Sequence, residues 1–345
     1  MLIPLDGAEG EGGGQILRAA LTLSAVTGQG FRVERIRARR LRPGLRPQHL
    51  AAVRAAALSC AAEVHGGFDG SPDLRFVPGR PAAGEFRFDI GTAGATSLVL
   101  QTVIPILGAA PAASRVEVIG GTHVPRSPSF HFLARHWSEV LGRLGLHAPL
   151  ELERTGFHPR GGGEVRAQVL PWTRPAGLDF SRRGALVAVR GVAGQARLRG
   201  DVAQRAAEAA RTLLWENRRL ETEWQVLDLN APSPGAFLQV EAVFENGRAA
   251  FAHLGERGLR AEVLGERAAR RVLRFLEDED AVVDPWLADQ LAVPLALAGG
   301  GGRLVTSEVT SHLETVASVV RAFGFEARSF GRSGGPGGLE VGRVA

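Results

Sequence analysis

A run of glycines between acids, near the start of the chain, is the first place where the residues could do chemistry. Residues 9–18 read EGEGGGQILR and follow a short apolar segment, Met1–Leu5. This order predicts a strand, a glycine loop and the start of a helix, where free backbone N–H groups favour phosphate. Glu9 and Glu11 would repel a bare phosphate. A divalent cation that bridges a carboxylate and the phosphate would allow both to occupy the same site. A tight turn with solvated acids is the alternative, and a glycine loop alone favours it.

A histidine near the carboxyl end is the second candidate. His312 follows Thr310 and Ser311, directly after a predicted strand and at the entry to a helix. The positive end of a helix disfavours imidazolium, so a ring at this place would stay neutral and nucleophilic. The alternative is that Ser311 caps the helix and His312 is an ordinary side chain of its first turn.

The composition narrows the possible chemistry. All 41 basic residues counted as Lys or Arg are arginine. A lysine Schiff base and a G-K-[ST] nucleotide site are therefore excluded, and histidine becomes the preferred nucleophile for nucleotidyl transfer. The single cysteine, Cys60, excludes an internal disulfide and a cysteine-based zinc site. The net charge of +5 favours anionic partners.

Arginines cluster after a predicted strand that begins at Phe31. Guanidinium groups bind phosphate oxygens through two parallel hydrogen bonds, so the cluster favours an anion-binding loop, although a solvated charged face is the alternative. Aromatic residues make up only 6% of the chain, which argues against extended stacking on single-stranded bases. The cluster consists of Arg32, Arg35, Arg37, Arg39, Arg40, Arg42 and Arg46.

The elements that must position these residues form a repeating pattern of strand, turn and helix. Strands are predicted over Glu85–Ile90, Arg115–Ile119 and Arg303–Glu308 from their alternation of apolar and polar residues. Each leads through small or turn residues into a helix. The predicted helices cover residues 47–65, 96–108, 129–145 and 311–324. Similar modules packed side by side predict an α/β fold of layered helices and sheets.

The middle of the chain differs and predicts a second domain. Strands are expected over 184–192, 222–229 and 236–244, and helices over 201–217 and 261–277. We therefore expect an inserted α/β domain at residues 185–280 within a large domain formed by residues 1–184 and 281–345. The chain shows neither a long apolar run nor a signal-peptide pattern, so no membrane association is expected and the cytoplasm is the expected compartment.

Seven short segments, spread from near the amino end to near the carboxyl end, carry a resemblance to a known family. They are Glu11–Arg18, Ile36–Ala38, Pro43–Leu50, Gly120–Thr122, Pro159–Gly163, Trp286–Leu291 and Thr310–His312. In this order they resemble the RNA 3′-terminal phosphate cyclase family. The resemblance implies an α/β fold of the α+β type. Its large domain would consist of repeated βαβαββ units like the carboxyl-terminal domain of bacterial initiation factor three, with a smaller inserted domain of thioredoxin-like topology.

The resemblance also implies a reaction. The family uses ATP and a divalent metal, Mg or Mn, to convert the 3′-terminal phosphate of an RNA to a 2′,3′-cyclic phosphodiester. A histidine carries AMP covalently, and His312 matches that position. AMP then passes to the RNA phosphate, and the neighbouring 2′-hydroxyl closes the ring with release of AMP.

The matched positions assign further roles. Glu11 is the expected metal contact, Arg18 is expected to reach the polyphosphate, and Trp286 stands where an adenine-stacking tyrosine is common. Asp289 could accept a hydrogen bond from a ribose hydroxyl, a metal-bound water or the imidazole N–H. Arg39 replaces a small residue between the family's two basic positions. The expected nucleotide contacts are Gln15, Arg18, Arg37, Arg40, Gln48, His49, Gln101, Trp286, Leu287, Ala288, Asp289 and Gln290.

Other histidines give weaker signals. His123 adjoins the Gly120–Thr122 segment, and His131 and His136 fall on a predicted helix, where they are interpreted as surface or packing residues. The family pattern has Arg or His directly before Gly156, where this chain has Thr155. His65, His147 and His253 have no supporting cluster, and His158 directly precedes the Pro159–Gly163 segment.

Two other functions are considered. A cyclase-like scaffold protein of ribosome assembly would share the fold, but the presence of His312, Glu11 and Asp289 argues against it. A carboxyvinyl transferase would also repeat βαβαββ units, but none of the segments above indicates its substrate site.

Overall fold

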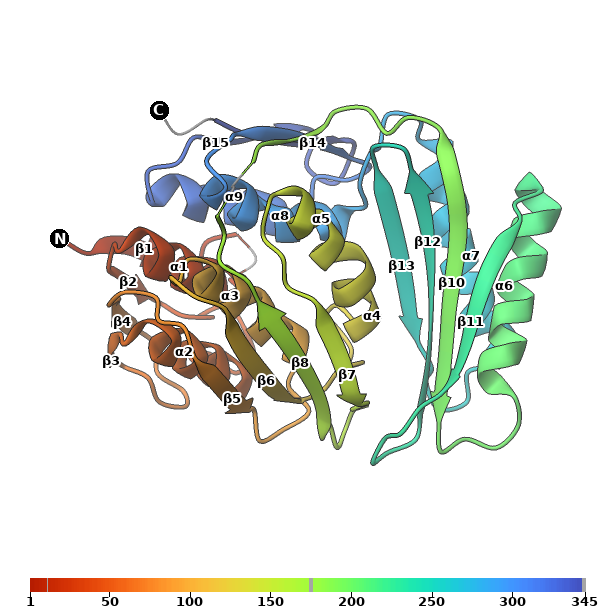
Figure 1. Cartoon of the computed structure of the whole chain (residues 1–345), viewed down its shortest axis with the longest axis horizontal. Helices are drawn as coiled ribbons and strands as arrows, with labels where there is room; N and C mark the ends of the chain where they lie inside the picture. The colour runs from red at the N-terminus through yellow and green to blue at the C-terminus, as the bar shows by residue number, and fades with distance from the viewer. Residues whose placement is uncertain (11, 174–175, 343–345) are drawn as a thin grey trace.

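The computed structural model describes residues 1–10, 12–173 and 176–342. These residues form four mixed sheets of four strands each, with helices packed on them (Figure 1). The first sheet has the order β1-β2-β4-β3. Its strands and the two helices of its connections are β1 (Ile3–Asp6), α1 (Gln15–Thr27), β2 (Phe31–Glu34), α2 (Pro47–Cys60), β3 (Glu63–His65) and β4 (Leu74–Val77). The predicted α/β class is confirmed.

A second sheet repeats this strand order as β5-β6-β8-β7. In both sheets the first two strands run parallel, and the last two are antiparallel to their neighbours. The elements of this segment are β5 (Glu85–Asp89), α3 (Thr96–Gly108), β6 (Ser114–Gly120), α4 (Phe130–Phe132), the π-helical turn η1 (Leu133–Trp137), α5 (Ser138–Arg143), β7 (Leu150–Arg154) and β8 (Gly163–Val169).

The third sheet has the same arrangement but draws on two distant parts of the chain. Its order is β9-β14-β16-β15, with β9 and β14 parallel. Its strands and helices are β9 (Leu178–Phe180), α8 (Pro285–Leu297), β14 (Gly302–Thr306), α9 (Ser311–Ala322), β15 (Ala327–Gly331) and β16 (Gly337–Val341). Helix α1 packs against α2, α3, α8 and α9, so it lies at the centre of the core shared by the three sheets.

The fourth sheet, β11-β10-β12-β13, comes from the stretch between β9 and α8 (Figure 1). Its elements are β10 (Leu186–Ala196), α6 (Val202–Arg218), β11 (Thr222–Asp228), β12 (Gly235–Phe244), β13 (Arg248–Leu254) and α7 (Ala261–Glu277). Alternate residues of β12 face opposite sides. Leu238 and Val240 join a hydrophobic core with α6 and α7, whereas Phe237 packs with Phe157 on the side of the larger body.

Several predicted elements need correction. The helix predicted over residues 129–145 is interrupted by the π-helical turn η1, and the strand predicted over 184–192 is β10, which runs to Ala196. Helix α2 ends at Cys60 rather than His65, because Ala61 adopts a left-handed conformation (φ 49°) and the chain turns into β3. Strand β13 was not predicted, since its sequence RAAFAHL is rich in alanine, which has little preference for strands. The predicted helices 96–108, 261–277 and 311–324 are confirmed to within two residues. No helix in the described part of the chain is long and apolar enough to cross a membrane.

Candidate active site

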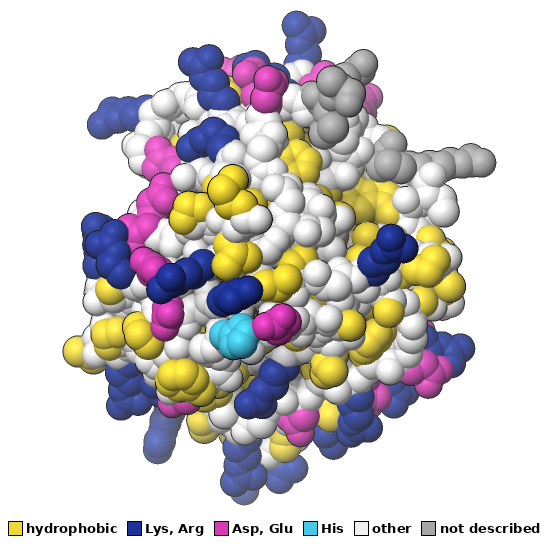
Figure 2. Space-filling view, turned by 90° about the vertical axis from the view of Figure 1, so that its left-hand side faces the viewer, with side chains coloured by type: hydrophobic (Ala, Val, Ile, Leu, Met, Phe, Trp, Pro, Cys, Tyr) yellow, Lys and Arg dark blue, Asp and Glu magenta, His cyan; other side chains and the backbone are white. Residues whose placement is uncertain are grey.

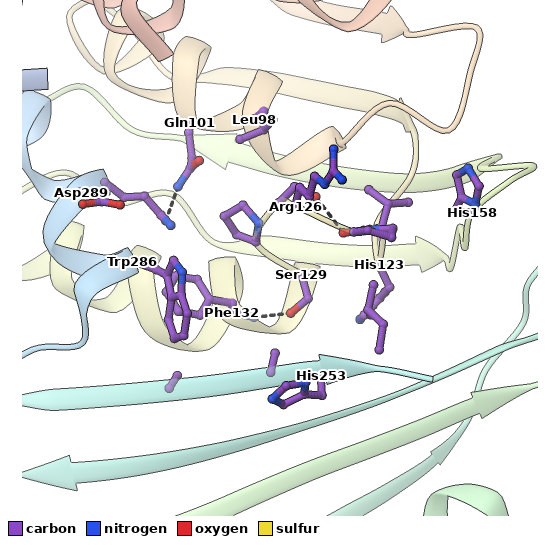
Figure 3. A pocket seen from close by; sticks show the side chains of 18 of the residues that line it. Leu98, Gln101, His123, Arg126, Ser129, Phe132, His158, His253, Trp286 and Asp289 are labelled. Carbon is purple, nitrogen blue, oxygen red and sulfur yellow. Dashed lines mark hydrogen bonds between the residues drawn. The ribbon is translucent and has the colours of Figure 1, made fainter. Parts of the chain in front are cut away.

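A cavity of about 890 Å³ opens between the core helices and the fourth sheet (Figure 3). Helices α1, α3, α8 and α9, strand β13 and the loop at 123–129 all contribute to its wall. Seven of the predicted site residues lie in this wall. They are Gln15, Arg18, Gln101, Trp286, Asp289, Gln290 and His312. Residues almost 300 positions apart in the sequence therefore meet at one site.

The start of α8 sets the direction of the adenine-stacking candidate. Asp284 caps the helix, because its Oδ1 accepts a hydrogen bond from the backbone N–H of Leu287 (2.9 Å), and Pro285 occupies the first helical position. Trp286 follows and is 38% exposed at the cavity. The guanidinium carbon of Arg271 lies 4.9 Å from the centre of its ring, and Phe251 meets the ring edge-on at 5.6 Å. These contacts fix the indole while leaving part of it accessible to a ligand.

One hydrogen bond joins α8 to the helix that carries the candidate nucleophile. The hydroxyl of Thr310 donates to Oδ1 of Asp289 (2.5 Å) and accepts from the backbone N–H of Leu313 (3.0 Å). Thr310 is thus the cap of α9, and the expectation that Ser311 could be the cap is wrong. His312 lies in the first turn of α9 and lines the same cavity as Asp289. The buried carboxylate of Asp289 is in this way tied to the helix cap that lies two residues before His312.

Two amides in the cavity wall are hydrogen-bonded to each other. The Nε2 of Gln101, on α3, donates to the Oε1 of Gln290, on α8. This bond satisfies half of each amide and links two helices that line the cavity. The amide nitrogen of Gln101 is therefore used in a contact with another side chain of the protein, and its amide oxygen is the group left to contact a ligand.

The entrance to α1 is shaped by a close approach of His49 to the glycine loop. A Cβ at Gly14 would lie 2.4 Å from Nε2 of His49 and 3.0 Å from Nη1 of Arg18, so only glycine fits there. His49 is 3% exposed, and its Nδ1 accepts a hydrogen bond from the backbone N–H of Arg46 (3.1 Å). Burial, helped by the charges of Arg18, Arg37 and Arg46, lowers the pKa of His49 to about 3. The ring is therefore neutral at pH 7, and its Nε2–H is a donor beside the glycines.

The arginine cluster is used largely for internal contacts. Arg32 pairs with Glu34 (2.7 Å), Arg35 with Asp6, and Arg46 with Asp69 (3.5 Å). Nη1 of Arg37 donates to the carbonyl oxygens of Arg42 (2.8 Å) and Gly44 (3.0 Å). Figure 2 views the side of the molecule on which β1–β4 lie, and basic side chains there are interspersed with acidic ones.

Other predicted contacts lie apart from the cavity wall. Arg40 and Gln48 are exposed, and with Arg37 and His49 they lie outside the set of residues that line the cavity. Leu287 and Ala288 are completely buried, so their side chains belong to the core and only their main chain could contact a nucleotide. Glu11, the predicted metal contact, lies outside the described residues. Within the described ranges, no three His, Cys, Asp or Glu side chains are grouped so that they could hold a metal ion.

Two histidines behind the cavity are buried, which confirms the packing interpretation made from the sequence. His131 and His136 are 6% and 0% exposed, so the surface alternative is wrong for both. Nε2 of His136 contacts Oδ2 of Asp284 (2.7 Å), which also accepts from the backbone N–H of Ala250 (3.1 Å). Asp284 therefore joins η1, β13 and α8. Its signal in the sequence is an aspartate directly before the helix-starting Pro285.

A second pair of histidines supports the loop at 123–129. His123 lies between the hydroxyl of Thr122 and Nδ1 of His131, both 2.9 Å away, and it packs on Phe237 with ring centres 4.3 Å apart. Burial lowers the pKa of both rings, that of His131 to about 3. Both rings are therefore neutral, and they pack between the chain that follows β6 and the fourth sheet.

Comparison with known proteins decides the family. The family model described as RNA 3′-terminal phosphate cyclase matches residues 9–327. The chain belongs to the RNA 3′-terminal phosphate cyclase family. Curated relatives named "RNA 3′-terminal phosphate cyclase" include those of Ralstonia nicotianae (46% identical, covering 93% of this chain and 91% of the relative) and Methylococcus capsulatus (43% identical, covering 94% and 91%). Another, from Nostoc punctiforme, is 40% identical and covers 94% of both chains. The resemblance seen in the sequence is confirmed, and the chain is an enzyme of the cyclase family rather than a carboxyvinyl transferase.

Proposed function

We propose that this enzyme converts an RNA 3′-terminal phosphate to a 2′,3′-cyclic phosphodiester with ATP, through an AMP covalently bound to His312. The observation that carries the proposal is the convergence of His312, Asp289, Trp286 and Arg18 on one cavity. An aromatic platform, a carboxylate, a cation and a nucleophile are the groups that binding and activating ATP would require.

The first step is attack on the α-phosphorus of ATP. A neutral nitrogen of His312 forms the N–P bond while the bond from the α-phosphorus to the bridging oxygen breaks, and pyrophosphate leaves. Trp286 stacks on the adenine and Asp289 accepts from a ribose hydroxyl. Arg18 and the donor Nε2–H of His49 offset charge on the polyphosphate. Glu11 and phosphate oxygens are suitable ligands for Mg²⁺ or Mn²⁺, which would supply further charge neutralisation when bound.

The second step transfers AMP from His312 to the RNA, and the third step closes the ring. A 3′-phosphate oxygen of the RNA attacks the phosphorus of the histidine-bound AMP, and the protonated imidazole leaves. The neighbouring 2′-hydroxyl then attacks the terminal phosphorus and expels AMP. The hydroxyl and its target already belong to one nucleotide, so proximity supplies much of the rate of this step.

The finer description of the fold is part of the same proposal. The three sheets with a common strand order are interpreted as βαβαββ units like the carboxyl-terminal domain of initiation factor three. Residues 185–280 are interpreted as an inserted thioredoxin-like domain with its own hydrophobic core, and residues 1–184 and 281–345 as the large domain. The cytoplasm remains the expected compartment.

The test is transfer of labelled AMP to the protein. Wild-type protein incubated with ATP labelled at the α-phosphate and with Mg²⁺ should acquire an acid-labile label, and His312→Ala should acquire none. His147→Ala is the matched control, since it removes an exposed histidine outside the cavity wall. Stable labelling of His312→Ala would overturn the proposal.

A further inference from the structure

The cavity is longer than the proposed nucleotide site. Phe251, in the middle of β13, lies against Trp286, while at the carboxyl end of the strand Leu254 pairs with Phe237 and the N–H of Gly255 donates to the carbonyl of Ala236 (2.7 Å). Ala250, Ala252 and Leu254 line the cavity along this strand. From Phe251 to Leu254 the strand advances three residues, about 10 Å at about 3.3 Å each. The floor of the cavity therefore continues well beyond the tryptophan.

The floor ends at loops that come from both halves of the molecule. Gly235, beside Ala236, packs so closely on Phe157 that a Cβ there would lie 2.3 Å from its ring. His158 follows Phe157, and Figure 3 shows it at the opposite end of the cavity from Asp289, with Arg126 between them. We call this end, lined by Arg126, His158 and Arg257, the distal end.

The distal end carries two arginine side chains that are not paired with carboxylates of the described residues. Arg126 and Arg257 are exposed and line the cavity, and no described residue forms a hydrogen bond or ion pair with either of them. This is the reverse of the arginine cluster at 32–46, where Arg32, Arg35 and Arg46 each pair with a carboxylate. Glu256 adjoins Arg257 in the same lining, and the side chains there still sum to a positive charge.

The small side chains of the floor suit a chain-like ligand. Alanines at positions 250 and 252 and a glycine at 255 give much of this strand's floor small side chains, and His253 and Leu254 are the larger ones that line it. Loop residues Pro125 and Pro128 form part of the opposite wall. A groove with a smooth floor and arginines at one end fits a phosphodiester backbone, because guanidinium groups bind phosphate oxygens and most nucleic-acid contacts are of this kind.

We propose that the distal end binds the single-stranded RNA segment directly 5′ to the terminal phosphate, with Arg126 and Arg257 contacting backbone phosphates. The proposal rests on the cyclase function proposed above and adds to it the path of the substrate. Recognition there is independent of base sequence, since the two arginines address phosphates rather than base edges.

Salt dependence of RNA binding tests the path. Binding of a fluorescent 10-nucleotide RNA with a 3′-phosphate is measured by anisotropy, without ATP, from 50 mM to 500 mM salt. For Arg126→Ala/Arg257→Ala, the slope of log K against log salt should fall by about 1.4, since each phosphate contact with a single strand contributes about 0.7. Affinity at 50 mM salt should fall about tenfold or more. The matched control is Arg54→Ala/Arg211→Ala, which removes two exposed arginines outside the cavity wall at the same cost in charge.

Two further readouts separate this proposal from the cyclase function. Labelling by ATP reports the nucleotide end by itself, and turnover of a nucleoside 3′-phosphate, which has no upstream phosphodiester, reports the terminal site. The double variant should lose far more activity on the 10-nucleotide RNA than on the nucleoside 3′-phosphate. Equal salt slopes for variant and control, or equal losses on both substrates, would overturn the path. Failure of the wild type to become labelled would overturn the cyclase mechanism, while the salt slopes would still decide whether RNA binds here.

Discussion

Replacing Asp284 should reveal how much of the site depends on one buried carboxylate. Asp284 is 0% exposed and receives three contacts: the N–H of Leu287 at 2.9 Å, the N–H of Ala250 at 3.1 Å and Nε2 of His136 at 2.7 Å. Asp284→Ala removes a helix cap, worth about 1 kcal/mol, and leaves two buried polar groups without an acceptor, at about 1–3 kcal/mol each. We expect the free energy of unfolding to fall by about 3–5 kcal/mol, a range typical of breaking a buried pair.

Urea denaturation followed by tryptophan fluorescence measures this loss. Asp201→Ala is the matched control, because Asp201 precedes helix α6 but its side chain forms no cap hydrogen bond. The control should change the free energy of unfolding by less than about 0.5 kcal/mol. Asp284→Asn should fall between the two, since an amide retains one acceptor and loses the charge. A loss for Asp284→Ala within 1 kcal/mol of the control would refute the reasoning.

Three further predictions concern the glycine loop, the threonine bridge and acid stability. Gly14→Ala places a methyl group 2.4 Å from Nε2 of His49, so labelling of the protein by ATP should fall at least about tenfold. Gly84→Ala is the control, because its Cβ would meet no atom closer than 3.6 Å, and this variant should be labelled normally. Thr310→Val removes the cap of α9 and the donor to Asp289; labelling should slow and stability should fall by about 1 kcal/mol, with both recovered in Thr310→Ser. The pKa values of His49 and His131 are both lowered to about 3, so the unfolded chain binds more protons than the folded one between about pH 3 and 6.5. Stability should therefore be complete above pH 6.5 and fall by roughly 1–2 kcal/mol per ring on going to pH 5, and unchanged urea midpoints over that range would contradict the burial of these rings.

Long elements with a strong apolar period could be predicted from the sequence, and short or alanine-rich ones could not. Helix α7 was predicted at its observed bounds, because its polar and apolar residues separate cleanly onto two faces. Strand β13 was missed because three of its seven residues are alanine, and its strand conformation is imposed by pairing with β12. Helix α2 was extended too far because neither Gly nor Pro marks its end at Ala61.

The site shows the same division. Six of the seven predicted residues in the cavity wall, all except Gln101, belong to short segments with a family pattern, although their meeting depends on the whole fold. The contact between His136 and Asp284 joins residues 148 positions apart, and no local signal announces it. The pairing of Arg35 and Arg46 has no local signal either, since their partners are Asp6, at the end of β1, and Asp69, which lies 23 positions beyond Arg46. Local sequence indicates which groups are present, and long-range packing decides which of them remain available to a ligand.

The most direct measurement locates the AMP on the protein. The chain has no lysine, so trypsin cuts it only after arginine, and residues 304–321 are released as one peptide whose single histidine is His312. After incubation with ATP and Mg²⁺ and digestion under conditions that preserve the N–P bond, mass spectrometry should find AMP on this peptide alone. AMP on another histidine-containing peptide, such as the one with His49, or a protein that takes up no AMP, would contradict the central claim.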